Sequence, residues 1–210
     1  MKFSLLAAVS ICLSVLSFAA QTEIRDGFEE IAVTVKSQDK YYMKHIRNGW
    51  DFGKGPVIFH PARWLPNIGK NGRFMSIDCS EDDRMGPFVH SGNGSLRVGV
   101  VGGKGSVHVL CRTSVVPGRY RLSAWTRGNG KLNFVAYVYF APGDSRIVTK
   151  QLGCATQPSD EWRHVEASVS CGADEARAKS VTLAFVVSGG DVYLDDLVLV
   201  PDDGKGEDRR

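Results

Sequence analysis

Residues 107–125, VHVLCRTSVVPGRYRLSAW, contain the pattern that decides the fold. Apolar or β-branched side chains stand at every second position up to Val115, and a second alternating run starts at Tyr120. A period of two places one set of side chains on one face of a strand. Between the runs, Pro117 and Gly118 suit a type II turn, because Gly accepts the positive φ that this turn requires. The stretch therefore predicts two consecutive β-strands joined by a tight turn.

The same alternation continues on both sides of this stretch. Further apolar or β-branched runs, separated by turns rich in Gly, Pro and Asp, occupy residues 96–100, 134–140, 147–152, 165–171, 181–187 and 192–200. Helical periodicity is nearly absent, and its best example, residues 173–179, is too short to stand alone. Many short strands at close spacing are typical of sandwiches and barrels. We therefore expect an all-β fold, a two-sheet antiparallel β-sandwich.

The start of the chain has the composition of a secretory signal peptide. Lys2 precedes an apolar run, no residue from Phe3 to Thr22 is charged, and small residues stand at Ser17 and Ala19. This order predicts a signal peptide over residues 1–19. The alternative is an uncleaved membrane anchor, since about 20 uncharged residues can span a bilayer. With cleavage, no remaining segment is apolar enough to span a membrane, and we expect a secreted, periplasmic or cell-surface protein.

The pattern between the leader and the regular strands is mixed. Residues 20–45 are expected to form an N-terminal extension with one possible strand, because apolar residues alternate from Ile31 to Val35. Residues 48–71 combine Gly, Pro and aromatic residues without periodicity, which indicates ordered loops with short strand pieces. The folded domain is expected over residues 46–201. The charged tail, residues 202–210, has no apolar anchor and is expected to be disordered.

The charge and the cysteine content of the chain restrict its possible binding partners and its cellular compartment. The chain has 26 Lys and Arg against 23 Asp and Glu, and so small a net charge indicates no nucleic-acid partner. Outside the leader stand Cys79, Cys111, Cys154 and Cys171. An even number in an exported chain favours two disulfides, and the sequence does not choose among the possible pairings. A zinc site is the alternative, but it favours close C-x-x-C pairs, which are absent.

Several of these segments, taken in order, resemble one family. They are Asn48-Gly49 with Asp51-Phe52, a Pro-rich loop with tryptophan at residues 61–64, HSGNGSLRV at 90–98, VVPGRYRLSAW at 115–125, Trp162, and VYLDDLVL at 192–199. The chain resembles the CenC-type carbohydrate-binding modules of families 4, 9, 16 and 22, which share a galactose-binding-like jelly roll. The resemblance implies an exported, non-catalytic domain that binds a poly- or oligosaccharide, accessory to polysaccharide degradation or cell-surface glycan binding.

The resemblance also implies a structural calcium ion. In the family, the acidic motif that stands here as Asp195-Asp196 contributes to a calcium site with an acidic residue of the opening loop, for which Asp51 is the candidate. The family usually has Glu where this chain has Gly53, a departure that weakens the match. From the residues alone, one of the Asp pair must face inward, since it interrupts an apolar strand. The alternative is that the pair caps backbone amides or meets an arginine.

Aromatic side chains are the candidates for sugar contact, because flat rings stack on the apolar faces of pyranose units. Four aromatic side chains and one cation are predicted to bind the ligand: Trp50, Trp64, Tyr137, Tyr139 and Arg121. Tyr137 and Tyr139 share one face of their strand, where they are equally explained as ordinary residues of a half-buried face. Trp162 opens a strand and is expected in the core, as is Trp125 by the family pattern.

No motif for catalysis occurs in the sequence. The chain has no G-x-S-x-G elbow, no H-E-x-x-H pair and no P-loop, so no catalytic residue is expected. Carbohydrate binding is the first hypothesis. The second is a structural or protein-interaction jelly roll of the periplasm or cell surface, which the N-terminal extension and the cysteines fit as well. The third is a hydrolase of glycosidic bonds, which needs two carboxylates across a cleft.

Overall fold

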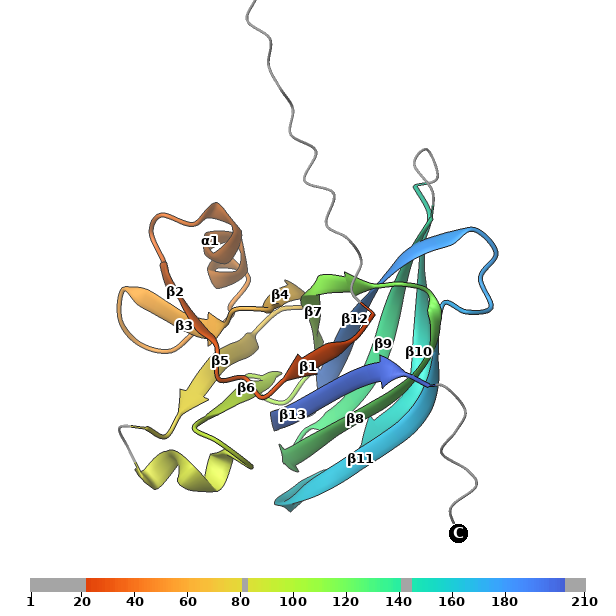
Figure 1. Ribbon diagram of the computed structural model, residues 1–210. Coiled ribbons are helices and arrows are strands. Elements are labelled where there is room, and N and C mark those ends of the chain that lie inside the picture. Colours follow the sequence, from red (N-terminus) through yellow and green to blue (C-terminus); the bar gives the residue numbers. More distant parts are fainter. Residues whose placement is uncertain (1–21, 81–82, 141–144, 203–210) are drawn as a thin grey trace, which may run out of the picture.

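The computed structural model describes residues 22–80, 83–140 and 145–202, and it forms two antiparallel sheets packed face to face (Figure 1). The expected signal peptide and most of the expected disordered tail lie outside the described residues. Strands β6 to β13 make the body of the sandwich: Gly94–Val100, Ser106–Val115, Gly118–Gly128, Lys131–Phe140, Ile147–Thr156, Ser159–Cys171, Ala178–Ser188 and Asp191–Pro201. The expected all-β antiparallel sandwich is confirmed.

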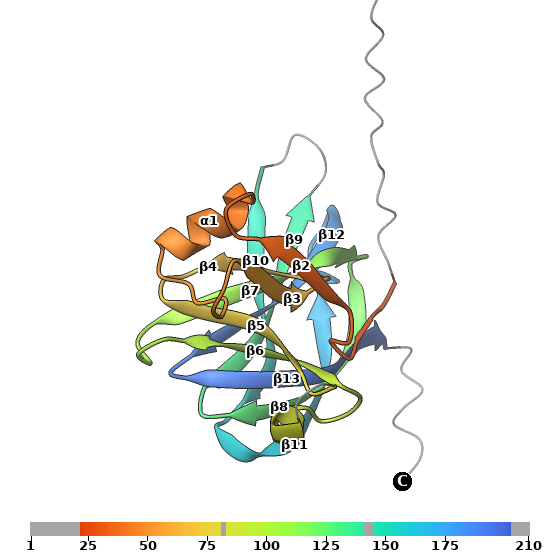
Figure 2. The ribbon, with the colours of Figure 1, turned by 90° about the vertical axis from the view of Figure 1, so that its left-hand side faces the viewer.

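The order of the strands defines the jelly roll. Sheet I has the order β11-β8-β13-β6-β5, and sheet II has the order β10-β9-β12-β7-β4. Between β6 and β13 the chain crosses from one sheet to the other at every connection except the hairpin from β9 to β10. Two interleaved sets of antiparallel strands connected in this way are the double Greek key of a jelly roll. Figure 2 shows the strands of sheet I stacked from β5 down to β11.

Smaller elements extend the two sheets and close one end of the sandwich. They are β1 (Ile24–Asp26), β2 (Ile31–Val35), α1 (Lys40–Arg47), β3 (Val57–Pro61), β4 (Trp64–Ile68), β5 (Gly72–Asp78) and the 3-10 helix η1 (Asp83–Phe88). β1 pairs with β13, and β2 pairs only with β3 in a separate ribbon. Ile24, Phe28 and Tyr42 are buried in the same core as the sandwich. Residues 20–45 were expected as an extension with one strand, but the described part of this range, residues 22–45, is an integral part of the domain.

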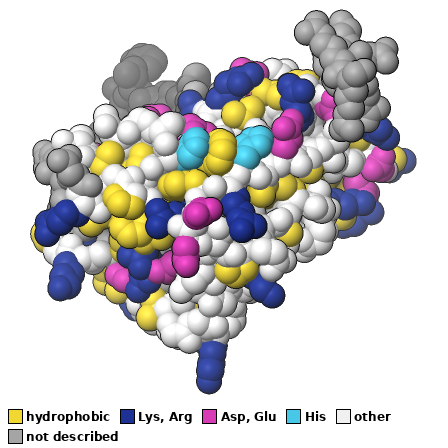
Figure 3. All heavy atoms as spheres, turned by 90° about the horizontal axis from the view of Figure 1, so that it is seen from below, with side chains coloured by type: hydrophobic (Ala, Val, Ile, Leu, Met, Phe, Trp, Pro, Cys, Tyr) yellow, Lys and Arg dark blue, Asp and Glu magenta, His cyan; other side chains and the backbone are white. Residues whose placement is uncertain are grey.

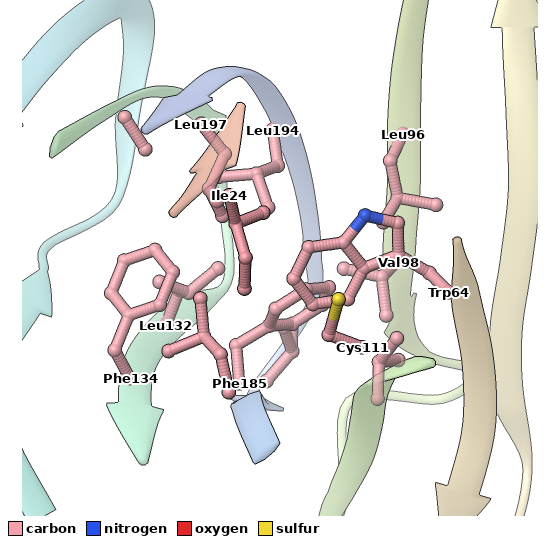
Figure 4. Close-up of a cluster of buried hydrophobic side chains, with 14 of the residues drawn as sticks. Ile24, Trp64, Leu96, Val98, Cys111, Leu132, Phe134, Phe185, Leu194 and Leu197 are labelled. Atoms are coloured by element: carbon pink, nitrogen blue, oxygen red, sulfur yellow. The ribbon is translucent and has the colours of Figure 1, made fainter. Parts of the chain in front are cut away.

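The core lies between the two sheets, where the inward-facing residues of both meet (Figure 4). Leu96 and Leu194 come from sheet I, and Phe134 and Phe185 come from sheet II. Trp64 of β4 is fully buried, with its ring 5.0 Å from that of Phe185. Burying a large apolar side chain stabilises the fold by about 1.5–3 kcal/mol, so this layer supplies most of the driving force.

Helix α1 was not expected, because it is too short to show helical periodicity. It begins at a local signal, since the Asp39 carboxylate accepts hydrogen bonds from the backbone N–H groups of Tyr41 and Tyr42. Such capping satisfies amides that have no partner within the helix. Tyr42 then packs edge-on against Phe52, which holds the helix to the sandwich. Tertiary contact, rather than helical propensity, stabilises an element of this length.

The expectation of two disulfides is contradicted: all four cysteines carry free thiols. Cys111, Cys154 and Cys171 are buried on three different strands, and Cys79 is partly exposed after β5. Burial raises the pKa of the Cys111 thiol to about 11 and that of Cys171 to about 12, because the thiolate would lose its hydration. These two side chains therefore act as small apolar core residues. Among the described residues, no helix is long and apolar enough to cross a membrane.

Candidate functional site

The site begins at a change of partner along β13. Residues Asp191 to Leu194 pair with β6, whereas Leu197 to Leu199 pair with β1. Between them the register with β8 shifts, and Asp196 has a φ of 48°. A bulge at such a position redirects side chains out of the regular alternation. Asp195 and Asp196 occupy this bulge.

Asp195 is fully buried and holds the loop that precedes β6. Its Oδ2 atom accepts hydrogen bonds from the backbone N–H groups of His90 at 2.9 Å and Ser91 at 3.1 Å. Its Oδ1 atom accepts a third from the backbone N–H of Asp196 at 2.7 Å. Burial raises the pKa of the Asp195 carboxyl to about 6, and the three amides oppose this shift. The interpretation of Asp195 as a cap for backbone amides therefore accounts for its burial.

Asp196 binds the side chains of the same loop. Its Oδ2 atom lies 2.8 Å from Nδ1 of His90, and its Oδ1 atom accepts a hydrogen bond from the Ser91 hydroxyl at 2.8 Å. The His90 imidazole is thereby fixed over the indole of Trp125, with centroids 3.9 Å apart and planes inclined by 15°. Trp162 meets the same imidazole nearly edge-on, at 5.6 Å and 67°. Two acidic residues thus position a histidine within an aromatic cluster.

This cluster forms one end of a continuous surface on the outer side of sheet I, which we call the β8–β11 face. Antiparallel pairing sets Trp125 opposite His164 and Ser123 opposite Glu166. The β8–β11 face consists of Arg121, Ser123 and Trp125 from β8, Trp162, His164 and Glu166 from β11, and His90 above them. Each of these residues is partly or fully exposed. Figure 3 views this side from below and shows two histidines with a hydrophobic side chain between them, surrounded by charged groups.

Charged groups also cover the other half of the outer side of sheet I. Asp191 bonds to Arg73 and to Arg97, and Arg73 also meets Asp51 at 3.2 Å. Burial acts to raise the pKa of Asp51, but the hydrogen bond from the Gly53 amide and the nearby Arg73 guanidinium together keep that pKa below its usual value. Next to them Phe88 of η1 stacks on Tyr193, with centroids 4.7 Å apart. The charged and aromatic side chains named here on this half of the surface are therefore engaged with one another.

The acidic residues predicted to bind calcium are therefore not brought together. Asp195 and Asp196 bind the loop at His90 and Ser91, whereas Asp51 binds Arg73 and the Gly53 amide. Across the described ranges, no group of three or more His, Cys, Asp or Glu side chains is placed to hold a metal ion. These carboxylates already accept hydrogen bonds from protein groups. In a calcium site, by contrast, the carboxylate oxygens face one cation, so the observed arrangement does not fit such a site.

The predicted sugar-binding residues fall in three separate places. Trp50 and Trp64 are buried in the core, and their indole N–H groups donate to Gly69 O and to Asp26 Oδ2. Tyr137 and Tyr139 lie on the outer side of sheet II, where Tyr137 is only 8% exposed. The Tyr137 hydroxyl is 2.7 Å from His108 Nδ1, and only Tyr139 is partly open. Arg121 alone lies on the β8–β11 face, in an ion pair with Glu166 at 3.6 Å.

The tryptophans expected in the core are the two that reach the surface: both are partly exposed, although the Trp162 Nε1 atom is buried. Tyr120, Leu122 and Ala124 point inward along β8, so alternation alone places Trp125 outward. The family pattern, which assigns Trp125 to the core, was misleading here. For Trp162 and His164, alternation along the sequence is a weaker guide to which side chains point outward. The pairing register of β11 with β8 shifts between Ser159 and Arg163. The position of His90 depends on the loop and the β13 bulge, for which the sequence has no simple signature.

No protein-family profile and no curated protein sequence matches this chain. Among solved structures it is similar to the CBM22-2 xylan-binding domain of Xyn10C from Paenibacillus barcinonensis, at 12% identity and a TM-score of 0.49, covering 67% of this chain and 92% of that one. The CBM22-1 domain of the same protein has 16% sequence identity and a TM-score of 0.46, and the match covers 72% of this chain and 92% of that one. A family 16 carbohydrate-binding module has 15% sequence identity and a TM-score of 0.38, and the match covers 60% of this chain and 84% of that one. Likeness at this level carries no argument about what this chain binds.

Proposed function

We propose that this protein binds a glycan on the β8–β11 face and performs no chemistry on it. The observation that carries the proposal is the pair of partly exposed tryptophans, Trp125 and Trp162, held in place by His90. Rings fixed in advance lose little conformational entropy when a ligand stacks on them. Indole and imidazole surfaces suit the apolar faces of sugar rings.

Polar groups beside the rings supply the second requirement of sugar recognition. Ser123, Arg121 and Glu166 continue the β8–β11 face away from the tryptophans. They offer donors and acceptors for hydroxyl groups along an extended chain of sugars. The cross-strand pairs of this face succeed one another along the strands. The face therefore favours a linear oligosaccharide of several units over a single monosaccharide.

The carboxylates of this surface are engaged in ways that suit binding rather than hydrolysis. Glu166 is paired with Arg121, and Asp196 is bonded to His90 and Ser91. Glycosidases use two carboxyl groups that flank the scissile bond, one of them able to donate a proton. We therefore propose a non-catalytic role. The apolar leader supports export, and with it an accessory function in polysaccharide degradation or glycan binding at the cell surface.

Affinity electrophoresis on soluble xylans, β-glucans and galactans tests the proposal. We expect retardation on at least one polymer, and roughly ten-fold weaker binding for Trp162→Ala, which removes a partly exposed ring. Tyr139→Ala is the matched control, since it removes a ring from sheet II that is also partly exposed. Binding lost in Tyr139→Ala and kept in Trp162→Ala would move the site to sheet II. No binding on a broad glycan array would refute the proposal.

A further inference from the structure

The ribbon formed by β2 and β3 exposes an apolar surface away from the β8–β11 face. Val33 and Phe59 are cross-strand partners and are 59% and 52% exposed, and the next residue on the same side, Val35, is 38% exposed. Figure 1 shows the ribbon at the side of the sandwich, below α1. β3 contacts β4 and β5, so β3 lies between β2 and the sheets. The outer edge of β2 faces away from the body of the protein.

The backbone groups on that outer edge have no partner strand among the described residues. The N–H of Lys36 bonds to Pro56 O, and the N–H of Ala62 bonds to Glu30 O. In an antiparallel pair the hydrogen-bonded residues alternate, so Ala32 and Thr34 direct their amides and carbonyls to β3. The amides and carbonyls of Ile31, Val33 and Val35 therefore point outward, and the Val35 carbonyl accepts a hydrogen bond from the Gln38 N–H at 3.1 Å. An uncovered apolar edge of this kind is a template for another strand.

The sequence of this edge identifies its partner. Residues 30–36 read EIAVTVK, which is complementary to itself when two copies run antiparallel about Val33. In that register Val33 faces Val33 of the other copy, Ile31 faces Val35, and Glu30 faces Lys36. The three outward residues then pair with one another, and both hydrogen bonds form at the central Val33 pair. At each Ile31–Val35 pair the Ile31 amide uses the second acceptor position of the Val35 carbonyl, which already accepts from the Gln38 N–H. Opposite charges directly across from each other stabilise antiparallel strands, and like charges destabilise them.

We propose that a second copy of this chain pairs with the free edge of β2, making a two-fold dimer through a continuous β3-β2-β2-β3 sheet. The exposed valines and Phe59 of both copies become neighbours on one side of that sheet. The Lys36 ammonium donates to Gly53 O at 2.7 Å and has further donors for the Glu30 carboxylate of the other copy. This dimer leaves the β8–β11 face free, and it gives a glycan two binding sites on one particle.

Charge reversal tests the pairing by sedimentation equilibrium from micromolar to millimolar concentration. Glu30→Lys and Lys36→Glu each put like charges across the dimer, and we expect each to weaken dimerisation by about ten-fold. Mixing the two variants restores opposite charges, so we expect a mixed dimer with nearly the original affinity. Intramolecular effects of either substitution cannot produce this recovery, because each chain in the mixture still carries its own substitution.

A backbone variant tests the edge itself. Val33→Pro removes an outward N–H that has no partner strand within the described ranges, so we expect it to abolish the dimer and leave the melting temperature of the monomer nearly unchanged. Ile147→Lys is the control, since Ile147 is 56% exposed on β10, the edge strand of sheet II. A chain that stays monomeric at millimolar concentration would overturn the proposal. So would a dimer that survives Val33→Pro, or one that only Ile147→Lys breaks.

Discussion

The imidazole of His90 stacks on the indole of Trp125, with 3.9 Å between ring centroids, and it connects the loop before β6 to strand β8 of sheet I. The two residues are 35 positions apart in the sequence, and the β13 bulge brings them together. Asp195 holds the backbone of the loop and Asp196 holds the imidazole. The exposed aromatic surface therefore depends on a buried polar arrangement directly beside it.

Removing the imidazole tests that dependence. We expect His90→Ala to lower the free energy of unfolding by about 1–2 kcal/mol, because it loses the ring stack and the contact with Asp196. Urea denaturation measures the change. His164→Ala is the matched control, and since His164 is exposed we expect a change within about 0.5 kcal/mol. Equal effects of the two substitutions would show that His90 has no special structural role.

The buried Asp195 carboxyl predicts a pH dependence of stability. Its pKa in the folded chain is about 6, above the ordinary value of 3.8, so the folded state binds the proton more tightly than the unfolded state. This contribution to the free energy of unfolding is complete below pH 3.8, falls as the pH rises toward 6, and is constant above that. The fall is at most about 3 kcal/mol.

Comparison with Asp195→Asn isolates this group from the others that titrate in the same range. Asn keeps an acceptor for the His90 and Ser91 amides but does not ionise. We expect the stability of the native chain, relative to the variant, to decrease between pH 4 and pH 6 in equilibrium denaturation. A relative stability that rises over this interval would mean that the three amides outweigh burial and lower the pKa of Asp195.

Chelation tests the metal that the resemblance implies. Calcium bound only to the folded chain would stabilise it by mass action, so EDTA would lower the melting temperature. We expect no change, because the oxygens of Asp195, Asp196 and Asp51 already accept bonds from amides, a hydroxyl, His90 or Arg73. A lower melting temperature in EDTA that added calcium reverses would show that these contacts rearrange around an ion.

The sandwich was predictable because its strands are long and alternate regularly. The alternation from Val107 to Val115 and from Tyr120 onward corresponds to β7 and β8 in the structure. The region before residue 72 was not predictable in the same way. Its elements are short, and Trp64 reads as a loop residue until the pairing of β4 with β7 buries it.

The candidate site was predictable only in part, for reasons that particular residues make clear. Arg121 and Trp125 lie outward because β8 is regular, so alternation alone indicates both positions, although the family pattern assigned Trp125 to the core. His90 required knowledge of the β13 bulge, which joins segments far apart in the chain. Tyr137 was placed on the correct face of β9, but its contact with His108 and its burial depend on packing between strands that no local pattern describes.

The tryptophan indole N–H signals test glycan binding on the β8–β11 face most directly. The chain has 4 tryptophans, and Trp50 and Trp64 are buried internal controls with bonded N–H groups. In ¹⁵N-¹H spectra recorded while a binding oligosaccharide is added, we predict that the Trp125 and Trp162 signals shift and saturate together, while those of Trp50 and Trp64 stay in place. Saturable binding that leaves both Trp125 and Trp162 unchanged would contradict the account.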